Sequence, residues 1–211
     1  MTDQHRRTAL WTVALILIVN APTCNSEELN PPENQRAIIA IMADRLDVPV
    51  IITDLDVYNG ETWRMENGSI VIYLDEQIFK YGYQKEEERL HKIAEWHYGK
   101  PIVAPDMIAE NIGYDKYPVL VMTHEIGHLK MYRYNERRGS CLDMDCFDAT
   151  DEWREIVENA TNNEWEIPTY YAERDYSELF AECYTLLEYG YTDWLTPEII
   201  DYIVNVNMNW Q

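Results

Sequence analysis

Apolar residues recur every three or four positions in several segments of the chain, which is the spacing of one buried face of an α-helix. In residues 33–46 this apolar side consists of Ile38, Ile39, Ile41, Met42 and Leu46. Similar patterns predict further helices over residues 84–98, 119–134, 151–159, 177–189 and 197–206. One predicted helix therefore precedes the strands described next, and the others follow them.

A different pattern lies between the first two predicted helices, where short runs rich in β-branched residues alternate with turn dipeptides. Strands are expected over residues 48–53, 61–65 and 69–74. The dipeptides Asn59-Gly60 and Asn67-Gly68 are typical of tight hairpin turns, because Asn and Gly accept positive φ angles. We therefore predict an α+β fold in which a small, mostly antiparallel sheet packs on helices.

The first residues have the features of an export segment. Arg6 and Arg7 precede the apolar run 8–19, which is shorter than the ~20 residues of a transmembrane helix. Ala21 offers a signal-peptidase site, whereas Cys24 lies in a sequence resembling a lipoprotein processing site. We expect a secreted or cell-surface protein, with membrane attachment only through an anchor at Cys24. The predicted organisation is an export segment (1–24), a linker (25–34) and one folded domain (35–211).

Composition narrows the classes of partner. Seven Trp and sixteen Tyr need a packed interior, so the net charge of −21 does not indicate a disordered chain. The 38 acidic residues outnumber the 17 Lys and Arg, and this excess repels phosphate groups. A nucleic-acid partner is therefore not expected.

The four cysteines fit an exported protein. Cys141 and Cys146 are spaced to close a small disulfide loop. Cys183 lies within an apolar helical pattern, which predicts a buried thiol.

The strongest chemical pattern is His124-Glu125-Ile126-Gly127-His128, an HExxH motif within a predicted helix. Residues i and i+4 lie on the same face of a helix, so His124 and His128 can bind one metal ion. Glu125 projects beside them and is suited to act as a general base toward a metal-activated water. The motif predicts a catalytic zinc site with one Zn²⁺ per chain.

A catalytic zinc ion usually has three protein ligands, so a third ligand must come from elsewhere. The extended metzincin pattern is excluded, because it requires Gly and His where this chain has Met131 and Tyr134. The helix predicted over residues 177–189 has Ser177 as its expected N-cap. It offers two carboxylates at i and i+4, Glu178 and Glu182. If Glu178 binds the metal, Glu182 can accept a hydrogen bond from a ligand imidazole.

The segment 171–182, YAERDYSELFAE, resembles the C-terminal zinc site of the anthrax lethal factor family, to which the Pro-Pro endopeptidases are similar. The resemblance extends over about residues 117–206 and implies a zincin-like fold. It also implies specific roles. The zinc ligands would be His124, His128 and Glu178, and Glu125 would be the general base. Tyr171 would donate a hydrogen bond to the oxyanion, with Tyr170 and Tyr176 as nearby alternatives. Glu182 would accept a hydrogen bond from a ligand imidazole.

These observations predict a secreted or surface-anchored zinc endopeptidase that hydrolyses peptide or protein substrates. Two alternatives stay open, a catalytically silent protein-binding module of the same fold and an intracellular regulatory metallopeptidase. The intact Glu125 argues against the first alternative, and the export segment argues against the second. Strand 69–74 is interpreted in two ways, as a sheet edge that binds an extended peptide or as a core strand without a substrate role.

Overall fold

A computed structural model describes residues 31–55, 58–81, 116–139, 150–167 and 175–210. The chain divides into two compact units, Met1–Asn30 and Pro31–Gln211, and the described residues belong to the second. Several predictions lie outside these residues. They are the export segment with Cys24, the helix at 84–98, the Cys141–Cys146 loop and the Tyr171 assignment.

The described part of the chain is α+β and mostly helical, with six α-helices and a small three-stranded mixed sheet. In chain order the elements are α2 (Pro31–Leu46), β1 (Val50–Thr53), β2 (Gly60–Arg64), β3 (Ile70–Asp75), α3 (Glu76–Tyr81), α6 (Tyr117–Arg137), α7 (Asp151–Asn162), α8 (Tyr176–Glu188), the 3-10 helix η2 (Thr192–Trp194) and α9 (Pro197–Asn209). The helices predicted within the described residues are confirmed, with ends that differ by a few residues.

Helix α3 was not predicted. Its six residues are too few to show a helical period. A capping signal is nevertheless present, because the Asp75 carboxylate accepts a hydrogen bond from the backbone N–H of Gln77 at 3.0 Å.

The strand order β1-β3-β2 corrects the predicted antiparallel meander. The turn predicted at Asn67-Gly68 is confirmed. Gly68 has a φ of +84°, and its N–H bonds to Met65 O at 2.8 Å between antiparallel β2 and β3. The predicted turn at Asn59-Gly60 is wrong, since Gly60 begins β2 and β1 pairs with β3 in parallel. Asn59-Gly60 lies between β1 and β2, and these two strands are not neighbours because β3 lies between them, so the dipeptide makes no hairpin. Strand β3 is therefore central and almost entirely buried.

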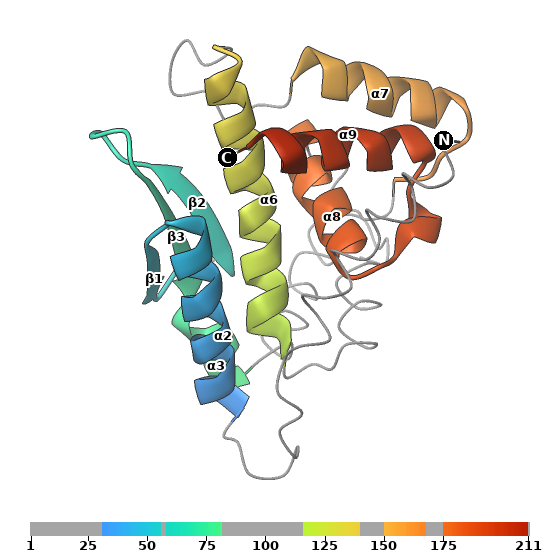
Figure 1. The fold of residues 1–211 in the computed structure, drawn as a ribbon. Coiled ribbons are helices and arrows are strands. Elements are labelled where there is room, and N and C mark those ends of the chain that lie inside the picture. Colours follow the sequence, from blue (N-terminus) through green and yellow to red (C-terminus); the bar gives the residue numbers. More distant parts are fainter. Residues whose placement is uncertain (1–30, 56–57, 82–115, 140–149, 168–174, 211) are drawn as a thin grey trace, which may run out of the picture. The chain divides into compact units, whose positions relative to one another are not determined.

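Helix α6 runs through the middle of this unit (Figure 1). It packs against α2, α3, β2 and β3 on one side and against α8 and α9 on the other. Such a helix is buried around most of its circumference. Fifteen of its 21 residues are buried, including the fully enclosed Met122 and Leu129. Beyond it, Trp153 of α7 stacks on Tyr202 of α9 at 5.3 Å and meets Phe180 of α8 edge-on at 5.4 Å. Cys183 is buried, as predicted.

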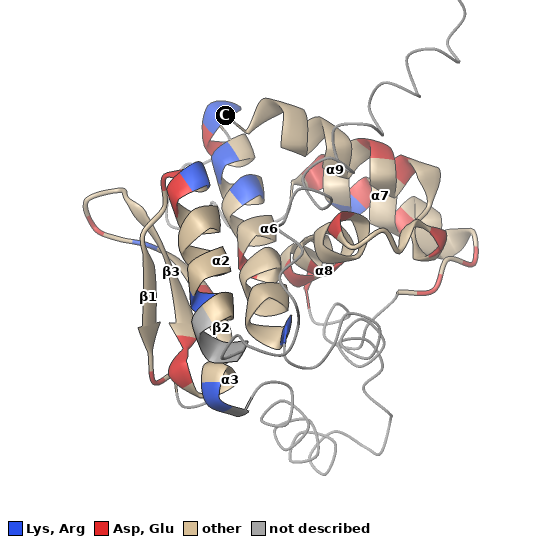
Figure 2. Cartoon of the chain, turned by 60° about the horizontal axis from the view of Figure 1, so that its bottom comes forward, with Lys and Arg blue, Asp and Glu red and all other residues tan. Residues whose placement is uncertain are grey.

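Charged residues are spread unevenly over α6 and α7 (Figure 2). Basic residues lie along the C-terminal half of α6, among them Lys130, Arg133 and Arg137, whereas Asp151 and Glu152 occupy the first turn of α7. The helix dipole favours Arg137 in the last turn of α6 and the two acids at the start of α7. None of the helices in the described ranges is both long and apolar enough to cross a lipid bilayer.

Candidate metal centre

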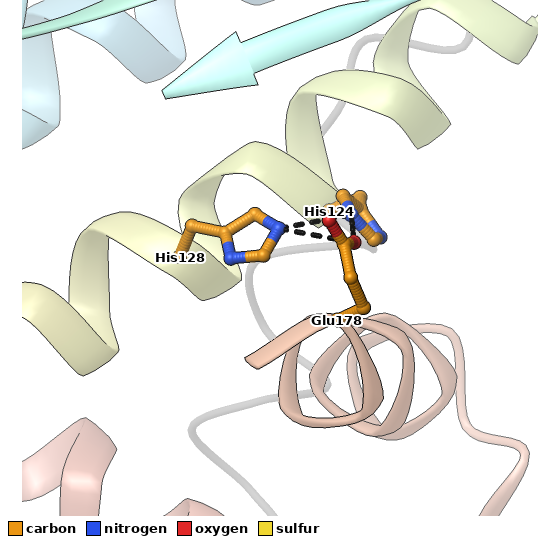
Figure 3. A group of neighbouring side chains, drawn as sticks. All are labelled: His124, His128 and Glu178. Carbon is orange, nitrogen blue, oxygen red and sulfur yellow. Dashed lines mark hydrogen bonds and ion pairs between the residues drawn. The ribbon is translucent and has the colours of Figure 1, made fainter. Parts of the chain in front are cut away.

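Three of the predicted site residues meet where α6 packs on α8 (Figure 3). His124 Nε2 lies 3.0 Å from Glu178 Oε2 and 3.1 Å from His128 Nε2, and His128 Nε2 lies 3.4 Å from the same Glu178 oxygen. All three side chains are partly buried. One nitrogen or oxygen of each residue thus points to a common centre.

These distances fit a metal ion. A tetrahedral zinc ion with bonds of about 2.0–2.1 Å to nitrogen and oxygen holds its ligand atoms about 3.3 Å apart. The separations of 3.0, 3.1 and 3.4 Å lie within a few tenths of an ångström of that value. Two imidazoles and one carboxylate are also a ligand set typical of a zinc site with an open fourth position. This His-His-Glu group could therefore hold a metal ion.

The glycine inside the motif explains why α6 and α8 come so close. A Cβ added at Gly127 would lie 2.8 Å from Ala181 Cα and 3.2 Å from Ala181 Cβ. A larger residue at either position would push the helices apart and separate Glu178 from the histidines. Sequence reasoning treated Gly127 only as a variable position of HExxH. The sequence nevertheless contains a signal, because a glycine inside a helix lowers the stability of that helix and is therefore expected mainly where close packing requires it.

Helix α8 begins one residue earlier than predicted, and its N-cap is Asp175 rather than Ser177. The Asp175 carboxylate accepts hydrogen bonds from the backbone N–H groups of Ser177 at 2.7 Å and Glu178 at 3.0 Å. An aspartate accepts such bonds as well as a serine does, so both residues were plausible caps in the sequence. The cap sets the first turn of α8, which carries Glu178 to the site.

Glu182 lies one turn further along α8 and contacts the other nitrogen of the His124 ring. Its Oε1 is 2.9 Å from His124 Nδ1. When Nδ1–H donates to this carboxylate, the His124 Nε2 lone pair is left free to face Glu178 and His128. Glu182 thereby selects the tautomer that can bind a metal.

The two carboxylates create a strong preference for positive charge. Burial by itself lowers the pKa of His124, but hydrogen bonds to Glu178 and Glu182 and their negative charges raise it well above the ordinary value. Burial raises the pKa of Glu178, whereas the hydrogen bonds from His124 and His128 lower it far below its usual range. Either a proton on His124 or a metal cation can supply the favoured charge.

Glu125 is buried beside these groups, with 4% of its surface exposed, and it lies against strand β2. Thr62 Oγ1 is 2.7 Å from Glu125 Oε2, and a Cβ added at Gly60 would lie 2.7 Å from Glu125 Oε1. Burial is the main cause that raises the pKa of Glu125. Sequence reasoning missed both strand residues, because their position opposite the helix depends on how β2 packs on α6.

The structure thus brings together His124, His128, Glu178 and Glu182, places Glu125 next to them on α6, and does not describe Tyr171. Comparisons with known protein families, with curated proteins and with solved structures found no match.

Proposed function

We propose that this protein is a zinc-dependent endopeptidase. The observation that carries the proposal is the convergence of His124 Nε2, His128 Nε2 and Glu178 Oε2 within hydrogen-bonding distances, next to the buried carboxylate of Glu125. A purely structural zinc site is normally closed by four protein ligands. Three ligands with a neighbouring base are the arrangement expected of a hydrolase.

The proposed division of labour follows from the positions of the side chains. Bound zinc would lower the pKa of a water molecule and polarise a peptide carbonyl. Glu125 accepts a proton at its carboxylate and later delivers a proton to the leaving amine. Glu182 holds the His124 ring in orientation through Nδ1. The resemblance to the lethal factor family adds Tyr171 as the proposed donor to the developing oxyanion.

The substrate-binding strand proposed here is β2. Strand β3 is paired on both sides, so the hypothesis that residues 69–74 form an open edge is wrong. Within the described residues β2 pairs with β3 alone, and it packs against α6 next to Glu125. An extended peptide could add to its other edge through backbone hydrogen bonds, which would bring a scissile bond near the base.

The decisive experiment pairs metal content with cleavage by the full-length protein. Zinc is counted per chain after purification, and a degenerate peptide library is incubated with the parent, with Glu125→Ala, and with Glu155→Ala as a matched control. Glu155 is an exposed residue of α7, away from the site. We expect one zinc per chain in all three proteins and cleavage by the parent and Glu155→Ala only.

Two other results would count against the proposal. Folded protein without zinc would overturn it. Stoichiometric zinc without cleavage would favour the protein-binding alternative. The proposed secreted or surface location is tested separately, by looking for the protein in the cell-free culture fraction and for a lipid on Cys24.

A further inference from the structure

The hydroxyl of Thr62 makes the closest polar contact of the Glu125 carboxylate among the described residues. Thr62 Oγ1 lies 2.7 Å from Glu125 Oε2 and 3.1 Å from the backbone oxygen of the same residue. A hydroxyl group has one proton to donate, and hydrogen bonds to ionised acceptors are shorter and stronger than those to neutral ones. The shorter contact therefore indicates that Thr62 donates to the carboxylate.

The strand also restricts the second oxygen of Glu125. Gly60 and Thr62 are two residues apart, so both lie on the same face of β2. A Cβ at Gly60 would come within 2.7 Å of Oε1 and 2.9 Å of Glu125 Cγ. Oε1 of Glu125 thus lies over Gly60, and glycine is the only residue type that leaves room for it. Oε2 accepts a hydrogen bond from the Thr62 hydroxyl. A glutamate side chain is flexible, and these two contacts hold its end in one orientation.

We infer that Thr62 is a positioning residue, which holds the carboxylate of Glu125 in the orientation that proton transfer requires. The inference rests on the proposed function and extends it to a second structural element. Proton transfer is sensitive to distance, and a displacement of about 1 Å can cost on the order of a hundredfold in rate. Strand β2 therefore orients the general base Glu125 on α6, in addition to forming an edge of the sheet.

The kinetic test compares two substitutions of the same residue in the full-length protein. Thr62→Val keeps the shape of the side chain but removes the donor, whereas Thr62→Ser keeps the donor. We expect Thr62→Val to lower kcat by about tenfold to a hundredfold with little change in KM or in zinc content. Thr62→Ser should restore kcat to within about threefold of the parent.

A control separates this effect from the general loss of a threonine hydroxyl. Thr185 is buried and donates to a backbone carbonyl, that of Ala181 at 2.8 Å, so Thr185→Val also removes a hydrogen bond. It should leave kcat close to that of the parent. An unchanged kcat in Thr62→Val, or no recovery in Thr62→Ser, would overturn the inference while leaving the proposed function intact.

A second test does not depend on activity. The unfolding equilibrium constant is measured by urea denaturation for the parent, Thr62→Val, Glu125→Ala and the double variant. Thr62→Val should raise this constant about tenfold more in the parent than in the Glu125→Ala background, because the hydrogen bond to the carboxylate exists only in the parent, whereas the backbone oxygen of residue 125 is present in both. Equal effects in both backgrounds would show that the contact is not formed. A parent that cleaves no peptide would overturn the proposed function and the positioning role of Thr62 together, and the unfolding measurements would still decide whether the contact exists.

Discussion

The close approach of α6 and α8 can be tested by adding one methyl group, in the substitution Gly127→Ala. The new Cβ would lie 2.8 Å from Ala181 Cα, whereas ordinary contacts begin at 3.4 Å, so the helices must move apart by about 0.6 Å (3.4 − 2.8). Overpacking of this kind costs about 1–3 kcal/mol. Alanine recovers about 1 kcal/mol through its higher helix propensity. The free energy of unfolding should therefore fall by no more than about 2 kcal/mol.

Zinc affinity is a more sensitive measurement of this displacement than the free energy of unfolding, because the higher helix propensity of alanine does not offset a loss of zinc affinity. Metal–ligand distances tolerate only about 0.2 Å of displacement, and the required movement separates Glu178 on α8 from both histidines on α6. We expect zinc affinity, measured by competition with a chelating indicator, to fall at least about tenfold. Asn159→Ala on the exposed face of α7 controls for helix propensity and should leave affinity unchanged. A Gly127→Ala protein that is folded and binds zinc like the parent would refute the reasoning.

The remaining predictions concern the groups around this contact. Glu182→Gln should weaken zinc binding about tenfold to a hundredfold in the same competition assay, because Glu182 orients the His124 ring. A zinc affinity of Glu182→Gln equal to that of the parent would contradict this orienting role. Gly60→Ala should lower kcat about tenfold or more while zinc content stays at one per chain, since the methyl group displaces the Glu125 carboxylate. Asp175→Ala should cost about 1 kcal/mol in urea unfolding and Ser177→Ala clearly less, because Asp175 is the cap of α8. A larger loss of stability in Ser177→Ala than in Asp175→Ala would instead identify Ser177 as the cap, as the sequence predicted. Zinc at about a hundred times its Kd should stabilise the fold by about 2.7 kcal/mol, and EDTA should abolish this gain.

Features that depend on neighbouring residues within one helix could be predicted from the sequence. The relation of His124 to His128, and of Glu178 to Glu182, follows from helical geometry once the helices are recognised. The same holds for the Asn67-Gly68 turn, which is specified by two residues and their allowed φ angles. The Asp175 cap is also local, and it was missed only because a second capping residue stood two positions away.

Features that depend on segments far apart in the chain were decided by the tertiary structure. The order of the strands, and with it the identity of the two edge strands, depends on how β1 and β2 both pair with β3 rather than on any residue within β3. The roles of Gly60, Thr62 and Gly127 likewise exist only because β2 and α8 pack on α6. A sequence pattern records the local conformational preference of each residue, whereas a close approach depends on the partner surface, which is formed only when the whole unit packs. The chemical groups of this candidate site were thus determined by the sequence alone, and their alignment with one another was determined by the packing of the fold.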